Sequence, residues 1–164
     1  MIRLSQQYEN INHFRKQIPV DVEGLSEALG VPIHRAYLDD DISGMIEAVK
    51  DDEYQITVNA RHPKTRQRFT IAHELGHYML HRHLIGDGID DDRAYRSTNV
   101  GKYHNMSIGP EEETEANRFA AGLLMPKESI QKLRAEGMTP IQMAERLQVS
   151  AHAMHIKLGV PYNA

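Results

Sequence analysis

The stretch FTIAHELGHYML, residues 69 to 80, decides how the rest of the chain is interpreted. It contains two histidines four residues apart, His73 and His77, with Glu74 directly after the first. Apolar residues recur around them at intervals of three and four, which predicts an α-helix. They are Phe69, Ala72, Leu75 and Met79. On such a helix the two imidazoles project from one side about 6 Å apart, so both can reach a single metal ion.

The neighbours of the two histidines support a catalytic interpretation. We expect Glu74 on the solvent-facing flank of the helix, from which a carboxylate can act as a general base on water without being a ligand. Gly76 costs the helix about 1 kcal/mol relative to alanine, so another element should pack closely against that turn. The alternative is an ordinary amphipathic helix, because H-E-x-x-H also occurs by chance in a chain with ten histidines.

A catalytic zinc site takes three protein ligands and leaves one position for water, so a third ligand is required. His81 continues the four-residue series, but three imidazoles along about 12 Å of straight helix cannot converge on one ion. His83 would need a glycine turn where this chain has Leu80, a good helix former. Neither histidine is expected to be the third ligand.

The acidic stretch at the start of a helix predicted for residues 111–125 offers other candidates. Projection on a helical wheel puts Glu112 and Glu113 near the apolar face and Glu115 well away from it. Asn117, four residues after Glu113, can orient a ligating imidazole, which favours Glu113. The alternative is that the acidic cluster only complements the positive end of the helix dipole.

Two motifs together resemble a known family. RQRFTIAHELGHYMLH, followed by ETEANRFAAGLLMP, is similar to the ImmA/IrrE family of bacterial metallopeptidases. In that family a gluzincin-type H-E-x-x-H helix is paired with E-x-x-A-N (or D) on a later helix. The resemblance spans about residues 54–126, and the two motifs are far more specific together than either is alone.

The resemblance implies roles for four residues. His73, His77 and Glu113 correspond to ligands of a Zn²⁺ cofactor, and Glu74 corresponds to the catalytic base. It also implies a zinc endopeptidase that hydrolyses a peptide bond in a regulatory protein, since characterised members cleave helix-turn-helix transcriptional repressors. The alternative is a regulatory protein that keeps the zinc fold and sequesters a repressor without cutting it.

Substrate contacts are assigned less directly. The strand YQITVNA, residues 54–60, either pairs as an edge with an extended substrate or lies inside the sheet. Residues 86–110 have no hydrophobic period, which predicts a long loop able to act as a lid. Polar side chains in this loop are candidates for stabilising the oxyanion or contacting the substrate. They are Tyr95, Arg96, Tyr103 and His104.

The whole pattern predicts an α+β fold, in which a small antiparallel three-stranded sheet packs on a zincin-type active-site helix and further helices follow. Helices are expected at residues 5–18, 22–30, 63–83 and 111–125, and strands at residues 31–38, 45–49 and 54–60. Residues 139–159 predict a C-terminal pair of helices that resembles a helix-turn-helix, with Thr139 and Ser150 as N-caps. Lys157 is the only lysine or arginine of its second helix, so we expect this pair to pack on the domain or to recognise substrate.

Length and composition set the remaining limits. With 164 residues the chain fits one domain, residues 1–164. The net charge of -4 disfavours direct nucleic-acid binding. The chain has no cysteine, so any metal must be held by His, Asp or Glu. No stretch reaches 18 apolar residues and the N-terminal segment lacks the apolar core of a signal peptide, which predicts a cytoplasmic protein with no membrane partner.

Overall fold

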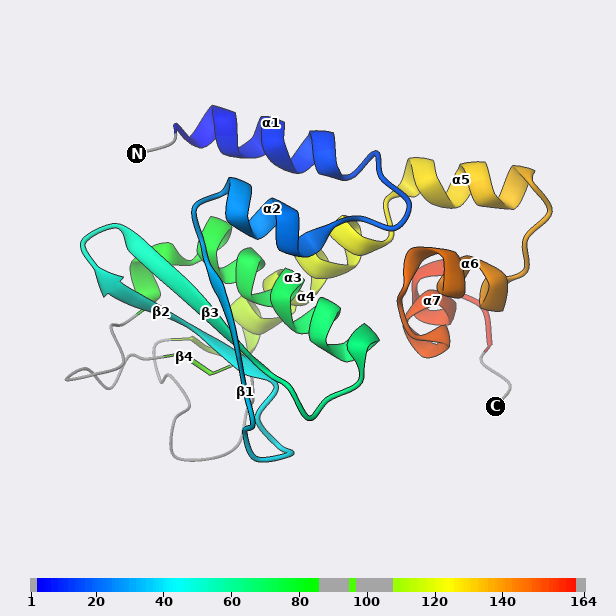
Figure 1. Cartoon of the computed structure of the whole chain (residues 1–164). Helices are drawn as coiled ribbons and strands as arrows, with labels where there is room; N and C mark the ends of the chain where they lie inside the picture. Colours follow the sequence, from blue (N-terminus) through cyan, green and yellow to red (C-terminus); the bar gives the residue numbers. More distant parts are fainter. Residues whose placement is uncertain (1–2, 86–94, 97–107, 162–164) are drawn as a thin grey trace.

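A computed structural model describes residues 3–85, 95–96 and 108–161 of the chain (Figure 1). The helices in these ranges are α1 Leu4–Phe14, α2 Val22–Ala28, α3 Lys64–Leu80, the short 3-10 helix η1 Arg82–Leu84, α4 Pro110–Leu124, α5 Lys127–Ala135, α6 Pro140–Leu147 and α7 Ala151–Leu158. The strands are β1 Ile33–Ala36, β2 Gly44–Lys50, β3 Glu53–Asn59 and β4 Tyr95–Arg96. The α+β class is therefore confirmed.

The sheet is mixed, so the prediction of a three-stranded antiparallel sheet is wrong. Its strand order is β1-β3-β2-β4. Strands β2 and β3 form an antiparallel pair, β1 runs parallel to β3, and the two-residue β4 adds to the outer side of β2. The interpretation of residues 54–60 as a substrate-pairing edge is also wrong, because β3 is hydrogen-bonded on both sides.

Asn59, at the end of β3, explains why β1 does not pair with β2. This fully buried side chain donates from Nδ2 to the carbonyl oxygens of Asp39 at 3.0 Å and Ile42 at 2.9 Å. Its Oδ1 accepts the backbone N–H of Arg61 at 3.0 Å. These bonds hold the connection between β1 and β2 across the end of β3, so β1 lies on the far side of β3. Turn composition alone does not distinguish such a crossing from a hairpin.

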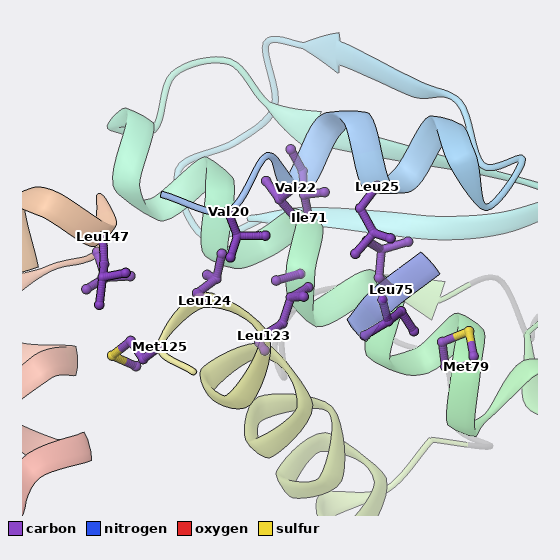
Figure 2. Packing of buried hydrophobic residues seen from close by; sticks show 14 of the residues in the cluster. Val20, Val22, Leu25, Ile71, Leu75, Met79, Leu123, Leu124, Met125 and Leu147 are labelled. Atoms are coloured by element: carbon purple, nitrogen blue, oxygen red, sulfur yellow. The ribbon is translucent and has the colours of Figure 1, made fainter. Parts of the chain in front are cut away.

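Helix α3 lies at the centre of the molecule (Figure 1). It packs against α2, α4 and strands β2 and β3, and every residue from Thr70 to Met79 is buried. Figure 2 shows its residues Ile71 and Leu75 facing Val22 and Leu25 of α2 within the hydrophobic core. A helix covered on all sides has no polar face, so periodicity alone could not show which of its polar residues reach solvent.

The C-terminal helical pair forms as predicted and packs beside the start of α3. Thr139 Oγ1 and Ser150 Oγ accept backbone N–H groups as N-caps, at 3.2 and 3.0 Å. Leu147 belongs to the same buried cluster as the residues of α2 and α3 (Figure 2). Arg68 of α3 donates to the carbonyl oxygens of Leu147 and Gln148, at 3.4 and 3.2 Å. The turn of the pair is thereby tied to the helix that carries H-E-x-x-H.

Two short elements were not predicted. Helix α5 begins directly after Pro126, in a part of the chain for which no element was predicted. Its sequence KESIQKLRA contains just two large apolar residues, Ile130 and Leu133, and both are buried. Strand β4 has only two residues, too few to show an alternation of side chains. Among the described helices, none combines the length and apolar character needed to cross a membrane.

We predict that Gly76→Ala destabilises the protein although alanine is the better helix former. A Cβ at position 76 would lie 3.1 Å from the Cα and 3.2 Å from the carbonyl oxygen of Ala116 in α4, and backbone atoms cannot move aside as a side-chain tip can. Overpacking costs about 1–3 kcal/mol against a propensity gain of about 1 kcal/mol, so the free energy of unfolding should fall by up to about 2 kcal/mol. Urea unfolding of the metal-free protein measures this change.

Gly122→Ala is the matched control for Gly76→Ala. Gly122 also lies within a helix, α4, and a Cβ there would meet nothing within 4 Å. The same substitution should therefore raise the free energy of unfolding by up to about 1 kcal/mol. Equal stabilisation by both substitutions would contradict the close approach of α3 and α4.

Candidate metal centre

His73 and His77 project from one side of α3, one helical turn apart. Their Nε2 atoms lie 3.1 Å from each other, and their ring planes are inclined at 80°. Both side chains are buried, with 5% of His73 and none of His77 exposed. The two lone-pair positions therefore point to the same small volume, as one metal ion requires.

Glu113 of α4 brings the third donor atom to this volume. Its Oε1 lies 2.8 Å from Nε2 of His77 and 3.4 Å from Nε2 of His73. One donor atom from each of the three residues lies within 4.8 Å of the others. Two imidazole nitrogens and one carboxylate oxygen match the donor set of catalytic zinc sites. No second group of three such side chains was found in the described part of the chain.

Local structure at the start of α4 separates Glu113 from Glu112, the two residues between which periodicity alone could not decide. The Glu112 side chain turns back and accepts the backbone N–H of Gly109 at 3.1 Å, which caps the first turn of α4. Glu113 instead points toward α3. Glu112 therefore stabilises the helix end, and only Glu113 joins the cluster with the two histidines.

Asn117, one turn further along α4, fixes the orientation of His73. Its Oδ1 lies 2.8 Å from Nδ1 of His73. An amide oxygen only accepts hydrogen bonds, so Nδ1 carries the proton and Nε2 keeps its lone pair toward Glu113 and His77. This is the arrangement expected for Asn117 from its spacing to Glu113.

The two imidazoles differ in electrostatics. Burial, with added repulsion from His73 and His81, lowers the pKa of His77 to about 4 even though Glu113 opposes the shift. At His73 burial acts in the same direction, but the hydrogen bond to Glu113 and the charges of Glu74 and Glu113 outweigh it and raise the pKa. Metal-free His77 is therefore neutral at neutral pH, and the raised pKa of His73 makes protons stronger competitors with a metal at that residue.

Glu74 is fully buried, which corrects its predicted position on a solvent-facing flank. The reason is that α3 is covered on all sides over this stretch. The negative charge of Glu74 contributes to the raised pKa of His73. Its role as catalytic base stays a prediction.

Comparison with known proteins shows the family. A model described as the IrrE N-terminal-like domain, Peptidase_M78, matches residues 26–159. The chain belongs to this metallopeptidase family. The resemblance inferred from the two motifs is confirmed.

Two curated relatives carry the name radiation response metalloprotease IrrE. This M78 chain is 33% identical to the protein from Deinococcus radiodurans and 34% identical to that from Deinococcus deserti, each over 113 residues. Both alignments cover 66% of this chain, but only 32% and 37% of the respective relatives. The chain thus corresponds to about a third of the length of these proteins.

His81 is the residue near the centre whose contribution was missed. Its Nδ1 lies 2.9 Å from Nδ1 of His77, on the side of that ring away from Glu113. The rejection of His81 as a ligand agrees with the three-residue cluster, which does not contain it. The spacing His73–His77–His81 did indicate that the third ring shares the face of the first two, although not that it would bond to the second.

The substrate contacts predicted in the long loop stay predictions. The structure describes the backbone of Tyr95 and Arg96, which pairs with Ile46 and Met45 of β2. The side chains of these two residues, and Tyr103 and His104 entirely, lie outside the described part of the chain. Strand β4 nevertheless joins part of the predicted loop to the sheet.

A cavity of about 330 Å³ lies next to the metal centre. Phe69, whose ring centre is 6.4 Å from that of His73, forms one wall. Val149 and Ala153, from the C-terminal helical pair, also line it. The lining is mainly apolar, with Thr65, Arg66 and Ser150 completing it. An apolar side chain fits such a cavity better than a charged one.

We predict that the purified protein binds about one zinc ion per chain and that His73→Ala, His77→Ala and Glu113→Ala each abolish stoichiometric binding. Each substitution removes one of only three donor atoms. Asn117→Ala should weaken binding by about 10- to 100-fold, because the ligand stays but loses its orientation. Competition with a chromophoric chelator measures all four variants. His34→Ala, which changes an exposed histidine of β1, is the control. Unchanged zinc content in His73→Ala would disprove the assignment of His73 as a ligand.

Proposed function

We propose that this M78 chain is a zinc-dependent endopeptidase that hydrolyses a peptide bond in a regulatory protein. The observation that carries the proposal is the buried convergence of His73, His77 and Glu113 from two helices. Family membership adds the reaction class, since the relatives are named metalloproteases. Zinc is favoured over harder cations because two of the three donors are imidazoles.

Three residues would bind the metal ion, and a fourth would transfer protons during peptide hydrolysis. His73, His77 and Glu113 would hold the ion, which when bound supplies a Lewis acid for the scissile carbonyl and for water. Glu74 accepts a proton from the attacking water on a carboxylate oxygen and later delivers it to the leaving amine. Because Glu74 is buried among packed elements, its carboxylate keeps one orientation during both transfers.

The cavity beside His73 offers the site for a substrate side chain. We propose that it takes a large apolar side chain next to the scissile bond, because Phe69 connects the cavity wall to a ligand of the metal centre. Val149 and Ala153 give the C-terminal helical pair a part in substrate recognition. This agrees with the preference for recognition or packing over DNA binding.

The proposed substrate is a helix-turn-helix transcriptional repressor. The support is the resemblance to the ImmA/IrrE family, strengthened by the family match. The relatives are about three times as long as the aligned region, so their full activities are not transferred to this chain.

We expect the zinc-loaded protein to cut the helix-turn-helix protein encoded beside it and Glu74→Gln to leave that protein intact. Glutamine keeps the shape of the side chain but cannot accept the proton, so turnover should fall by at least about 100-fold. Gel electrophoresis and mass spectrometry of the fragments measure cleavage. Zinc binding by Glu74→Gln must stay normal for the comparison to hold. Tight binding of the repressor by the wild type without fragments would support sequestration and refute the protease proposal.

Filling the cavity should reduce cleavage without affecting the metal. Ala153→Phe places a large ring in the space proposed for the substrate, so kcat/KM for a peptide with a large apolar residue there should fall by about 10- to 200-fold. Ile156→Phe is the control on the same helix, since Ile156 is 67% exposed. Fluorogenic peptides of matched sequence provide the measurement. Equal kcat/KM values for the two variants would exclude this cavity as a substrate site.

A further inference from the structure

We infer that His81 and Glu115 are positioning residues, which hold His77 in the tautomer that can bind a metal through Nε2. The inference deepens the proposed function, since it concerns the support of the same metal centre. It rests on three contacts that link α3 to α4 behind the ligands.

His81 lies between His77 and Glu115 and contacts both. It follows the last residue of α3 and is 4% exposed. Its Nδ1 is 2.9 Å from Nδ1 of His77, and its Nε2 is 3.4 Å from Oε1 of Glu115. The two rings are 5.1 Å apart between their centres. The three side chains therefore form a continuous chain from a ligand to a carboxylate on α4.

Counting protons fixes the direction of these hydrogen bonds. His77 turns Nε2 toward His73 and Glu113, so a neutral His77 that ligates there carries its one proton on Nδ1. That N–H can bond to His81 only if Nδ1 of His81 is unprotonated and accepts. A neutral His81 then carries its proton on Nε2 and donates it to the carboxylate of Glu115. Every donor in the chain faces an acceptor.

His73 has the same support from a different residue. Its Nδ1 is held at 2.8 Å by Oδ1 of Asn117, as Nδ1 of His77 is held at 2.9 Å by His81. Asn117 acts directly from α4, whereas Glu115 acts through His81. Helix α4 thus supplies a ligand, Glu113, and the two groups that orient the imidazoles of α3. Partners of this kind commonly change metal affinity by about 10- to 100-fold.

A purely structural role of His81 is the competing explanation. Its backbone N–H also bonds to the carbonyl oxygen of His77 at 2.7 Å, and its ring fills space at the end of α3. The two explanations differ in what they require of the side chain. Packing needs a ring of similar size, while positioning needs a hydrogen-bond acceptor at the place of Nδ1.

Three variants separate these explanations. His81→Phe keeps a planar ring and removes the acceptor, and should weaken zinc binding by about 10- to 100-fold. His81→Asn keeps an acceptor near the position of Nδ1 and should restore most of the lost affinity. Glu115→Leu should weaken binding by about 3- to 10-fold, less than His81→Phe because the Glu115 side chain is 46% exposed. Chelator competition at one fixed pH gives the affinities.

Two controls lie beside the tested residues. His83→Phe changes an exposed histidine two positions further on, and Glu111→Leu removes a charge from the exposed part of the first turn of α4. Neither should change zinc affinity by more than about twofold, since surface charges interact weakly. Thermal unfolding of each variant confirms that it is folded.

Nitrogen-15 NMR of the His77 imidazole provides a measurement that packing would not change. In the zinc-loaded wild type we expect the Nδ1–H proton of His77 to resonate at low field, because it is held in a hydrogen bond to His81. In His81→Phe this proton should move to higher field, and in His81→Asn it should return. Because the experiment follows one N–H group and not turnover, it tests the chain even if the protein proves not to be a peptidase.

The inference is overturned by any of three results. The first is folded His81→Phe that binds zinc as tightly as the wild type. The second is equal loss of affinity in His81→Phe and His81→Asn, which would make ring packing the cause. The third is a zinc-loaded wild type in which the Nδ1–H proton of His77 resonates at the same field as in His81→Phe. Absence of peptide cleavage would refute the proposed function and leave all three measurements unaffected.

Discussion

The close approach of α3 and α4 at Gly76 and Ala116 is the constraint on which the metal centre depends. A Cβ on Gly76 would lie 3.1 Å from the Cα of Ala116, so the helices meet backbone to backbone. His73 and His77 stand three residues before and one residue after Gly76. In α4, Glu113 likewise stands three residues before Ala116 and Asn117 one residue after it. At this distance a glutamate and an asparagine, both short side chains, reach across to the two imidazoles.

Because α3 and α4 approach each other so closely, the buried histidines of the metal centre depend on hydrogen-bond partners. Burying polar groups costs free energy unless each finds a hydrogen-bond partner or a charge of opposite sign. His73, His77 and His81 are all nine-tenths or more buried, and each contacts a residue of α4. The low pKa of His77 shows how strongly this environment disfavours its charged form. A metal ion would replace repulsion between neighbouring nitrogen atoms by coordination.

The sequence predicted those features that follow from the period of a single helix. It placed His73 and His77 on one face, and it reduced the third ligand to Glu112 or Glu113. The choice between them depends on the capping of α4 by Glu112, which is a property of the folded helix end. The sequence also indicated a close neighbour at Gly76, because an unfavourable residue inside a helix needs a reason.

Features that depend on how elements meet were less accessible to sequence analysis. The parallel pairing of β1 follows from buried hydrogen bonds of Asn59 to a connection some 20 residues earlier in the chain. The burial of Glu74 follows from the number of elements that cover α3, which its own periodicity does not report. His81 was considered only as a ligand, and its bond to His77 depends on the choice of side-chain conformation at the helix end.

The C-terminal helical pair shows that the contacts of a motif indicate its role better than the order of its helices does. It has the order of a helix-turn-helix, yet Leu147 and Met154 lie in the same buried cluster as the core of α2 and α3. Its turn is bonded to Arg68 of α3, and the family match continues through α7. Val149 and Phe69 line the same cavity. The position of this pair therefore agrees with the proposed part in substrate recognition, because its turn is held against α3.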